Sequence, residues 1–248
     1  MAEHEFDVVV VGAGPAGEVC AGRLADGGLS VAIVEDDLIG GECSFYACMP
    51  SKALLRPAQA LDETRRVPGA AEALASEGQR GTLDVQATLA RRDEVIHDLD
   101  DSGMEPWLDH KGIALFRGRG ALDGERRVVV GDDELSARTA VVIATGSGAA
   151  VPPIPGLREA KPWTNREVTT AKAAPDTLAI LGGGVVGVEM AQAWATLGSR
   201  VALIEAGPRV IAREEPFASE QVEDALRGLG VDVRTGAKAS AVSRENGR

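Results

Sequence analysis

Short apolar runs that end in glycine alternate with stretches rich in Ala and Leu near the start of the chain. Residues 6–11 form a β-branched run, a glycine-rich turn follows, and residues 19–25 carry apolar side chains at helical spacing. Residues 31–34 are then continuously apolar, which is typical of a parallel strand buried on both faces. The pattern predicts a strand, a turn, a helix and a second strand, which together make a βαβ unit.

The same pattern returns 170 positions later, and no gap is needed to align the two copies. In each copy three glycines with the spacing G-x-G-x-x-G follow a strand and open a helix, and an acid ends the next strand. The matched pairs are Gly12 with Gly182, Gly14 with Gly184, Gly17 with Gly187, and Glu35 with Glu205.

The segment between the copies predicts helices and short strands, followed by a break at the proline-rich residues 152–156. We therefore predict an α/β protein with two Rossmann-like dinucleotide-binding domains, residues 1–150 and residues 151–248. The predicted helices are residues 52–65 and 85–101, and the predicted strands are residues 113–116, 127–130, 140–143 and 230–235.

Composition excludes several classes of partner. The 248 residues carry a formal net charge of −12, the opposite sign from a surface that binds nucleic acid or anionic membranes. The three cysteines are too few for a secreted disulfide scaffold, and the N-terminal apolar run is too short for a signal peptide or a membrane span. We expect a cytoplasmic protein that binds neither nucleic acid nor membranes.

The glycine turns are the first candidate binding sites. Backbone N–H groups at the start of a helix can hold a pyrophosphate, glycine lets the ligand approach, and the acid can bond a ribose hydroxyl. The positions between the glycines are Pro15 and Ala16 in the first copy and Val185 and Val186 in the second. Two bound dinucleotides are predicted; the alternative is two tight turns without a ligand.

The acid of the second copy bears on the choice of nicotinamide nucleotide. Glu205 suits a free ribose 2′-hydroxyl and would repel a 2′-phosphate, which favours NADH over NADPH. Arg209 lies nearby and could accommodate that phosphate, so NADPH stays open.

Residues 40–52, with the sequence GGECSFYACMPSK, hold the third candidate site. Zinc is disfavoured because a tetrahedral site needs more donors than Cys43 and Cys48, and the three histidines form no spaced set with them. A purely structural disulfide that closes so short a loop would add only about 2 kcal/mol to the stability of the fold. A redox-active disulfide next to a dinucleotide site explains the pair better.

With these motifs in order, the chain resembles the class I pyridine nucleotide-disulfide oxidoreductases, the family of dihydrolipoamide dehydrogenase, glutathione reductase and mercuric reductase. The resemblance covers nearly the whole chain, and the C-x-x-x-x-C-x-P-S-K string is its most specific part. It makes the first domain FAD-type and the second NAD-type. The further cofactor-contacting positions that it implies are Gly41, Glu42, Lys52, Ala144, Thr145 and Gly146.

The resemblance implies a relay in which NADH reduces the flavin and the flavin reduces the Cys43–Cys48 disulfide, which then passes electrons to a disulfide or metal-ion acceptor. Cys48 would face the flavin and Cys43 would attack the substrate. Lys52 would lie near flavin N5, paired with Glu189, and stabilise negative charge on the reduced ring. The resemblance also implies a small-molecule or protein disulfide as the substrate, and a homodimer for the full-length enzyme.

The chain also departs from the family pattern. Members continue into a C-terminal dimerisation domain with a His-Pro motif, and none of the three histidines here precedes proline. We therefore expect a truncated second domain and no dimerisation domain. Glu42 replaces a threonine that commonly contacts the flavin nucleotide. The alternatives to the disulfide oxidoreductase are a dinucleotide-binding module without turnover and a flavoprotein NADH oxidase.

Overall fold

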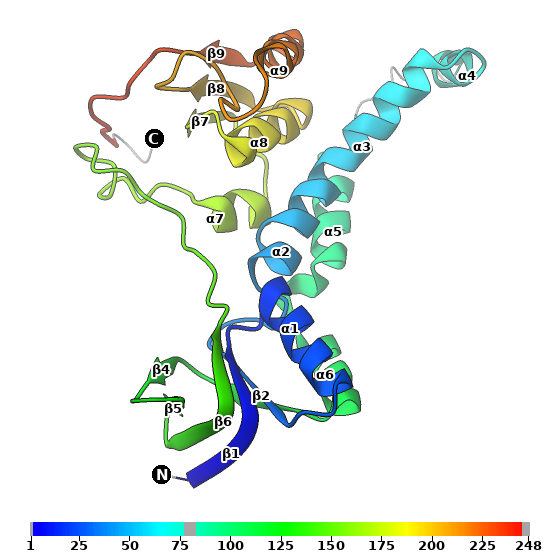
Figure 1. The fold of residues 1–248 in the computed structure, drawn as a ribbon. Coiled ribbons are helices and arrows are strands. Elements are labelled where there is room, and N and C mark those ends of the chain that lie inside the picture. The colour runs from blue at the N-terminus through cyan, green and yellow to red at the C-terminus, as the bar shows by residue number, and fades with distance from the viewer. Residues whose placement is uncertain (1, 77–82, 245–248) are drawn as a thin grey trace. The chain divides into compact units, whose positions relative to one another are not determined.

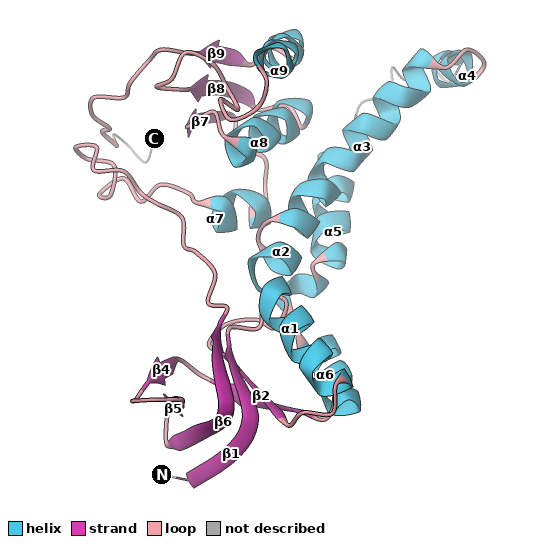
Figure 2. Ribbon diagram, in the orientation of Figure 1, coloured by secondary structure: helices cyan, strands magenta, loops and turns pink. Residues whose placement is uncertain are grey.

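The computed structural model describes residues 2–76 and 83–244 and divides into two compact units. The first comprises Met1–Met49 and Ile96–Gly148, and the second comprises Pro50–Val95 and Ala149–Arg248. Helices and mostly parallel sheets are present in both, as Figures 1 and 2 show. The predicted α/β class with two Rossmann-like sheets is confirmed.

The first unit is built on a six-stranded sheet in the order β3-β2-β1-β6-β5-β4. Strands β3, β2, β1 and β6 are parallel, and β5 and β4 continue the edge in antiparallel pairing. The strands are β1 (Ala2–Val11), β2 (Val31–Glu35), β3 (Ile113–Arg117), β4 (Gly120–Leu122), β5 (Arg127–Val130) and β6 (Asp133–Ile143); the helices are α1 (Pro15–Asp26), α2 (Gly41–Phe45), η1 (His97–Leu99), η2 (Ser102–Met104) and α6 (Glu105–Lys111).

Side chains of the central strands alternate between two cores, which explains why the strand sequences are apolar throughout. Val8 and Val10 of β1 pack in the same core as Ala21 of α1 and Leu108 of α6. Val9 and Val11 point to the opposite face, into a core that includes Val128 of β5. Burial on both faces fixes the register of β1 and therefore the position of the glycine turn at its carboxyl end.

The second unit has a three-stranded parallel sheet in the order β7-β8-β9. Its core joins the sheet to α8 and α9 and also takes in Leu54 of α3 and Leu89 of α5. The strands are β7 (Thr177–Leu181), β8 (Arg200–Ile204) and β9 (Asp232–Arg234); the helices are α3 (Cys48–Arg66, whose first two residues belong to the first unit), α4 (Ala70–Ser76), α5 (Val85–Val95), α7 (Asn165–Thr170), α8 (Val185–Thr196) and α9 (Pro216–Gly228). Over the described residues, no helix is both long and apolar enough to cross a membrane.

Several elements differ from the sequence prediction: β1 begins at Ala2 rather than at residue 6, and α3 begins at Cys48 rather than at residue 52. The helix predicted over residues 85–101 ends at Val95, because His97, Asp98 and Leu99 all have positive φ and reverse the chain. Strand β6 begins at Asp133 rather than at residue 140, since its first half pairs with the start of β1. Residues 50–95 pack with the second unit, and the division into cofactor domains at residues 150 and 151 stays a prediction.

Candidate functional site

The first glycine turn requires glycine at two positions. Gly12 has φ of 102°, and a Cβ there would lie 2.3 Å from the backbone oxygen of Ala144. A Cβ on Gly17 would lie 1.8 Å from the backbone oxygen of Gly12. Gly14 caps α1 without a side-chain hydrogen bond, so the capping residue itself satisfies none of the amides that a helix leaves open at its start. This arrangement fits the diphosphate of a dinucleotide.

Glu35 ends β2 beside this turn and is buried. Its Oε2 accepts a hydrogen bond from the Ala13 amide at 2.6 Å, and its Oε1 accepts one from the Asp37 amide at 2.8 Å. A carboxylate can accept further bonds on its remaining lone pairs, so the oxygens can still receive ribose hydroxyls. The two amides therefore orient the carboxylate at the edge of the glycine turn.

The second copy has the same geometry in the second unit. Gly182 has φ of 109°, and a Cβ on Gly187 would lie 2.0 Å from the Gly182 oxygen. Glu205 accepts from the Gly183 amide at 2.6 Å and from the Gly207 amide at 2.5 Å. Helix α1 begins at Pro15 and α8 begins at Val185, 170 positions later. Their capping glycines, Gly14 and Gly184, have nearly the same backbone angles. The duplication seen in the sequence is therefore a duplication of geometry.

The positions between the glycines lie on the first turns of these helices. Pro15 and Ala16 are exposed, and so are Val185 and Val186. In the first unit, Ala144, Thr145 and Gly146 directly follow β6, and Ala144 packs against the glycine turn. The structure thus brings Gly12, Gly17 and Ala144 together.

The cysteine motif joins the first glycine turn through a contact between two glycines. A Cβ on Gly41 would lie 2.8 Å from Gly14 Cα, and φ of Gly41 is 55°. Gly40, with φ of 112°, donates its amide to the Ala13 oxygen at 2.8 Å. Glu42 follows in the first turn of α2 and is half-buried. The start of α2 is therefore fixed against the nucleotide turn by close backbone packing.

Cys43 lies in α2 and Cys48 begins α3, and neither is in a disulfide. Their thiols are in hydrogen-bond contact. Burial, followed by the hydrogen bond with Cys48 and the charge of Cys48, together raise the pKa of the Cys43 thiol to about 11. The two sulfurs predicted to form the redox pair are therefore adjacent in the dithiol form.

Glu18 was not found by sequence reasoning. Its Oε1 is buried in α1 and has no hydrogen-bond partner among the described residues. Burial, followed by the nearby Glu35 carboxylate, raises the pKa of Glu18, and Glu18 in turn contributes to the raised pKa of Cys43. The available signal was an acid directly after the last glycine of the motif, in the first turn of a helix whose other charged residues, Arg23 and Asp26, lie toward its end.

Lys52 and Glu189 form an ion pair within the second unit. Lys52 Nζ lies 2.7 Å from Glu189 Oε1 and 2.8 Å from Oε2, and it also contacts the Ser51 hydroxyl at 3.2 Å. The pair joins α3 to α8. The role of these two residues beside a flavin stays a prediction.

Residues 2–76 and 83–244 contain no group of three or more His, Cys, Asp or Glu side chains arranged to hold a metal ion. Within the first unit the structure brings together the glycine turn, Glu35, Gly41 and Cys43. Within the second it brings together the turn at Gly182 and Glu205. Each unit can therefore offer one dinucleotide a glycine turn and an oriented acid.

Comparisons with known proteins agree with these features. A family model described as pyridine nucleotide-disulphide oxidoreductase matches residues 6–248. The chain is 35% identical to a mercuric reductase of Acidithiobacillus ferrooxidans over 98% of its length, and 32% identical to a dihydrolipoyl dehydrogenase of Acholeplasma laidlawii over 96%. It also resembles the HOCl-induced flavoprotein disulfide reductase RclA of Escherichia coli in its Cu(II) complex, with a TM-score of 0.80 and 27% identity over 98% of the chain.

The chain spans only part of these proteins. It covers 45% of the mercuric reductase, 70% of the dihydrolipoyl dehydrogenase and 52% of the RclA chain.

Proposed function

Because the chain belongs to the pyridine nucleotide-disulphide oxidoreductase family, we propose that it carries electrons from NAD(P)H to a disulfide or metal-ion acceptor, with FAD as its flavin. The observation that carries this proposal is the contact between the Cys43 and Cys48 thiols. The contact lies in the same unit as the glycine turn and Glu35, and α2 is packed against that turn through Gly41 and Gly14.

Each cofactor has its own set of holding residues in the proposal. Gly12, Gly14, Gly17 and Glu35 would hold the diphosphate and the ribose of FAD, with Gly41 close by, while Gly182, Gly184, Gly187 and Glu205 would hold the pyridine nucleotide. FAD, when bound, supplies two-electron exchange between a pyridine nucleotide and a dithiol. The protein supplies the orientation of both nucleotides and the thiol pair.

NADH is the preferred nucleotide in this proposal. Glu205 is held by two amides at the end of β8, where its charge would repel a 2′-phosphate. The guanidinium of Arg209 is engaged elsewhere, since it donates to the Glu214 oxygen at 3.0 Å and to the Ala212 oxygen at 2.7 Å. The arginine that could compensate a phosphate therefore already has two backbone acceptors.

The chemistry of the two thiols is balanced without a metal. A Cys43 thiolate attacks one sulfur of a substrate disulfide, and the S–S bond breaks to release one thiol and leave a mixed disulfide. Cys48 then attacks Cys43 Sγ, which releases the second thiol and forms the Cys43–Cys48 bond. The pair has lost two electrons and two protons, and the overall reaction is NADH plus H⁺ plus disulfide giving NAD⁺ and two thiols.

The remaining parts of the proposal concern Lys52 and the assembly. Lys52, held by Glu189, would present a cation to the reduced cofactor, where fixed positive charge stabilises developing negative charge. The active protein would be a cytoplasmic homodimer. The relatives include a mercuric reductase, a dihydrolipoyl dehydrogenase and a flavoprotein disulfide reductase. The proposal therefore includes both a disulfide and a metal ion as electron acceptors.

The visible spectrum of the purified chain before and after anaerobic NADH tests the proposal. We expect flavin absorbance that NADH bleaches, and two additional thiols that react with a disulfide reagent. Cys48→Ser should abolish the gain in thiols, while Cys20→Ser, which changes a cysteine outside the motif, should not. If the purified chain binds no flavin when FAD is added, the proposal is wrong.

Comparing reduction by NADH and by NADPH tests the nucleotide preference. NADH should be favoured, and Glu205→Gln should reduce that preference by about tenfold or more because it removes the repelling charge. An unchanged ratio would show that Glu205 does not contact the ribose.

A further inference from the structure

The loop formed by residues 36–40 connects the acid at the end of β2 to the start of α2. At one end, the Asp37 amide binds Glu35 Oε1, as described above. At the other, the Gly40 amide binds the Ala13 oxygen at 2.8 Å, and the Gly41 amide binds the Leu38 oxygen at 2.9 Å. A displacement of this loop would therefore move both the Glu35 carboxylate and the helix that carries Cys43.

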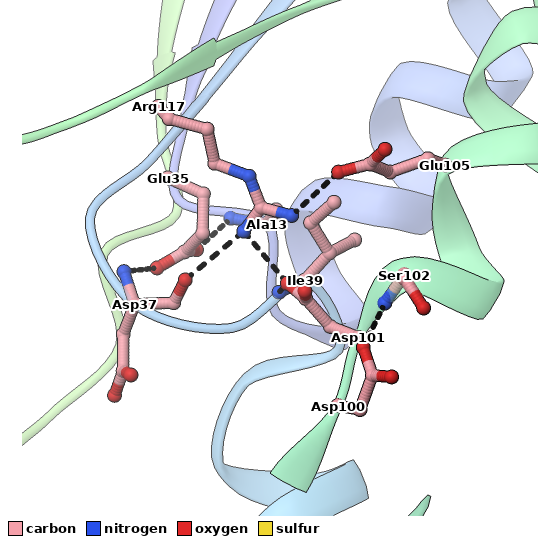
Figure 3. A network of polar contacts seen from close by, with 9 residues as sticks. All are labelled: Ala13, Glu35, Asp37, Ile39, Asp100, Asp101, Ser102, Glu105 and Arg117. Carbon is pink, nitrogen blue, oxygen red and sulfur yellow. Dashed lines mark hydrogen bonds and ion pairs between the residues drawn. The ribbon is translucent and has the colours of Figure 1, made fainter.

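The middle of the loop is held by an aspartate that lies far away in the sequence. Asp101 Oδ2 accepts a hydrogen bond from the Ile39 amide at 2.7 Å (Figure 3), and the Ile39 side chain is fully buried. Asp101 itself is mostly buried, with 12% of its side chain exposed. Without this carboxylate the Ile39 amide would lose its acceptor, which is costly for a group in a buried loop.

Arg117, the last residue of β3, holds Asp101 in turn. One of its guanidinium nitrogens lies 2.6 Å from Asp101 Oδ2 and 3.1 Å from the Asp37 oxygen, and the other lies 3.1 Å from Glu105 Oε1. Figure 3 shows Arg117 reaching between the loop and the segment that bears Asp101. Burial raises the pKa of Asp101, but Arg117 and the Ile39 amide outweigh burial, and the net pKa is lowered.

The segment before Asp101 has strained backbone. His97, Asp98 and Leu99 have φ of 50°, 51° and 64°, in the left-handed region that non-glycine residues rarely adopt. Three such residues in succession cost free energy and persist only where surrounding contacts fix them, and strain of this kind gathers at functional sites. Here it precedes the residue that binds the loop.

We infer that Asp101 and Arg117 are positioning residues for the FAD site, and that they act through the 36–40 loop to hold Glu35 for the ribose and α2 against the glycine turn. The inference rests on the proposed function, since it assumes that Glu35 binds FAD. It goes beyond that function because neither residue lies in the glycine turns or the cysteine motif.

A double-mutant cycle with FAD affinity as its readout tests the inference. Arg117→Met should weaken FAD binding by about tenfold or more, the range expected when a charged hydrogen bond is lost. In a Glu35→Gln background the same change should cost less than about twofold, because the group that it positions is already disabled. Arg119→Met, which changes an exposed arginine two residues further along, is the matched control and should leave affinity unchanged.

Amide hydrogen exchange at Ile39 provides a second readout that needs no flavin. Arg117→Met and Asp101→Ala should both speed this exchange, and Asp101→Asn should have a smaller effect because it retains an oxygen acceptor. Should Arg117→Met prevent folding, the two Asp101 variants carry the test.

The outcomes separate the inference from the function on which it rests. If the unmodified chain binds no FAD, the proposed function fails and the inference fails with it. The unmodified chain could bind FAD while the effects of Arg117→Met and Glu35→Gln on FAD affinity are additive. In that case Arg117 and Asp101 do not act through Glu35, and only the inference is overturned. Unchanged exchange at Ile39 in Asp101→Ala would also overturn it.

Discussion

Lys52 Nζ bonds both carboxylate oxygens of Glu189, at 2.7 and 2.8 Å, across 137 residues of sequence. The pair is partly exposed, with 61% of the Lys52 side chain and 27% of the Glu189 side chain accessible. Exposed ion pairs contribute only about 0–1 kcal/mol to stability. Lys52 lies on α3, four residues after Cys48, and its ion pair contributes little to stability. This small contribution favours a role for Lys52 in the chemistry of the site.

Lys52→Met should slow flavin reduction by NADH by about tenfold to a hundredfold, because in the proposed site this lysine would supply a fixed positive charge to the reduced cofactor. The free energy of unfolding should change by no more than about 1 kcal/mol. Stopped-flow absorbance and urea unfolding measure the two quantities. Arg56→Met, one helical turn further along α3, removes an exposed cation paired with Glu63 and should alter neither. Equal rates of flavin reduction in Lys52→Met and Arg56→Met would contradict a role for Lys52 in stabilising the reduced cofactor.

The ionisation of Cys43 should depend on Cys48. Because the thiolate is the reactive form, alkylation of Cys43 should accelerate about tenfold per pH unit and level off near pH 11, the value to which its pKa is raised. Cys48→Ala removes the neighbouring sulfur but leaves the burial, so the midpoint should fall below 11 and stay above the ordinary value of 9.0. Mass spectrometry of the alkylated peptide against pH measures this midpoint.

The variant Cys20→Ala provides the control for this titration, since Cys20 lies in α1 outside the cysteine motif. It should leave the Cys43 midpoint where it is. A midpoint that rises, or does not move, in Cys48→Ala would contradict the assigned cause of the raised pKa.

The glycine turns were predictable from sequence because their geometry is local. Positive φ at Gly12 and the contact between Gly17 and the Gly12 backbone arise within six residues, and β1 and β2 fix the turn from either side. The sequence therefore indicated the turn, the following helix and the acid at the strand end together.

Other parts of the site depend on contacts that no sequence period marks. Asp101 and Ile39 are 62 positions apart, and the helix pattern continued through the left-handed residues before Asp101. Glu18 resembled an ordinary helix residue, and only the packing around it shows that one of its oxygens has no partner among the described residues. Long-range polar contacts of this kind follow from tertiary packing rather than from propensity.

Two equivalent glycines should respond differently to alanine. Gly12 and Gly182 have φ of 102° and 109°, so the conformational strain of alanine is the same at both. A Cβ at Gly12 would lie 2.3 Å from the Ala144 oxygen, whereas a Cβ at Gly182 would meet no atom within 4 Å. Gly12→Ala should therefore destabilise the chain by about 1–3 kcal/mol more than Gly182→Ala, as overpacking does. Thermal unfolding of the two variants gives the comparison, and equal losses would show that strain alone decides both.

Arg92 should be the most costly arginine to remove. Its side chain is fully buried in α5, where it donates to the Thr169 oxygen, to the Ala171 oxygen at 2.8 Å, and to Asp93 at 2.9 Å. These carbonyls end α7, so Arg92 satisfies the acceptors that the helix leaves open. Arg92→Met should lower the free energy of unfolding by about 3–5 kcal/mol, because it leaves the Thr169 and Ala171 carbonyls without their donor and removes one of the two cations that pair with Asp93. Lys172→Met is the matched control: Lys172 pairs with the same Asp93 at 2.9 Å but is 70% exposed, and its loss should cost at most about 1 kcal/mol in urea unfolding. If the two variants unfolded at the same urea concentration, the carbonyl contacts of Arg92 would contribute nothing to stability.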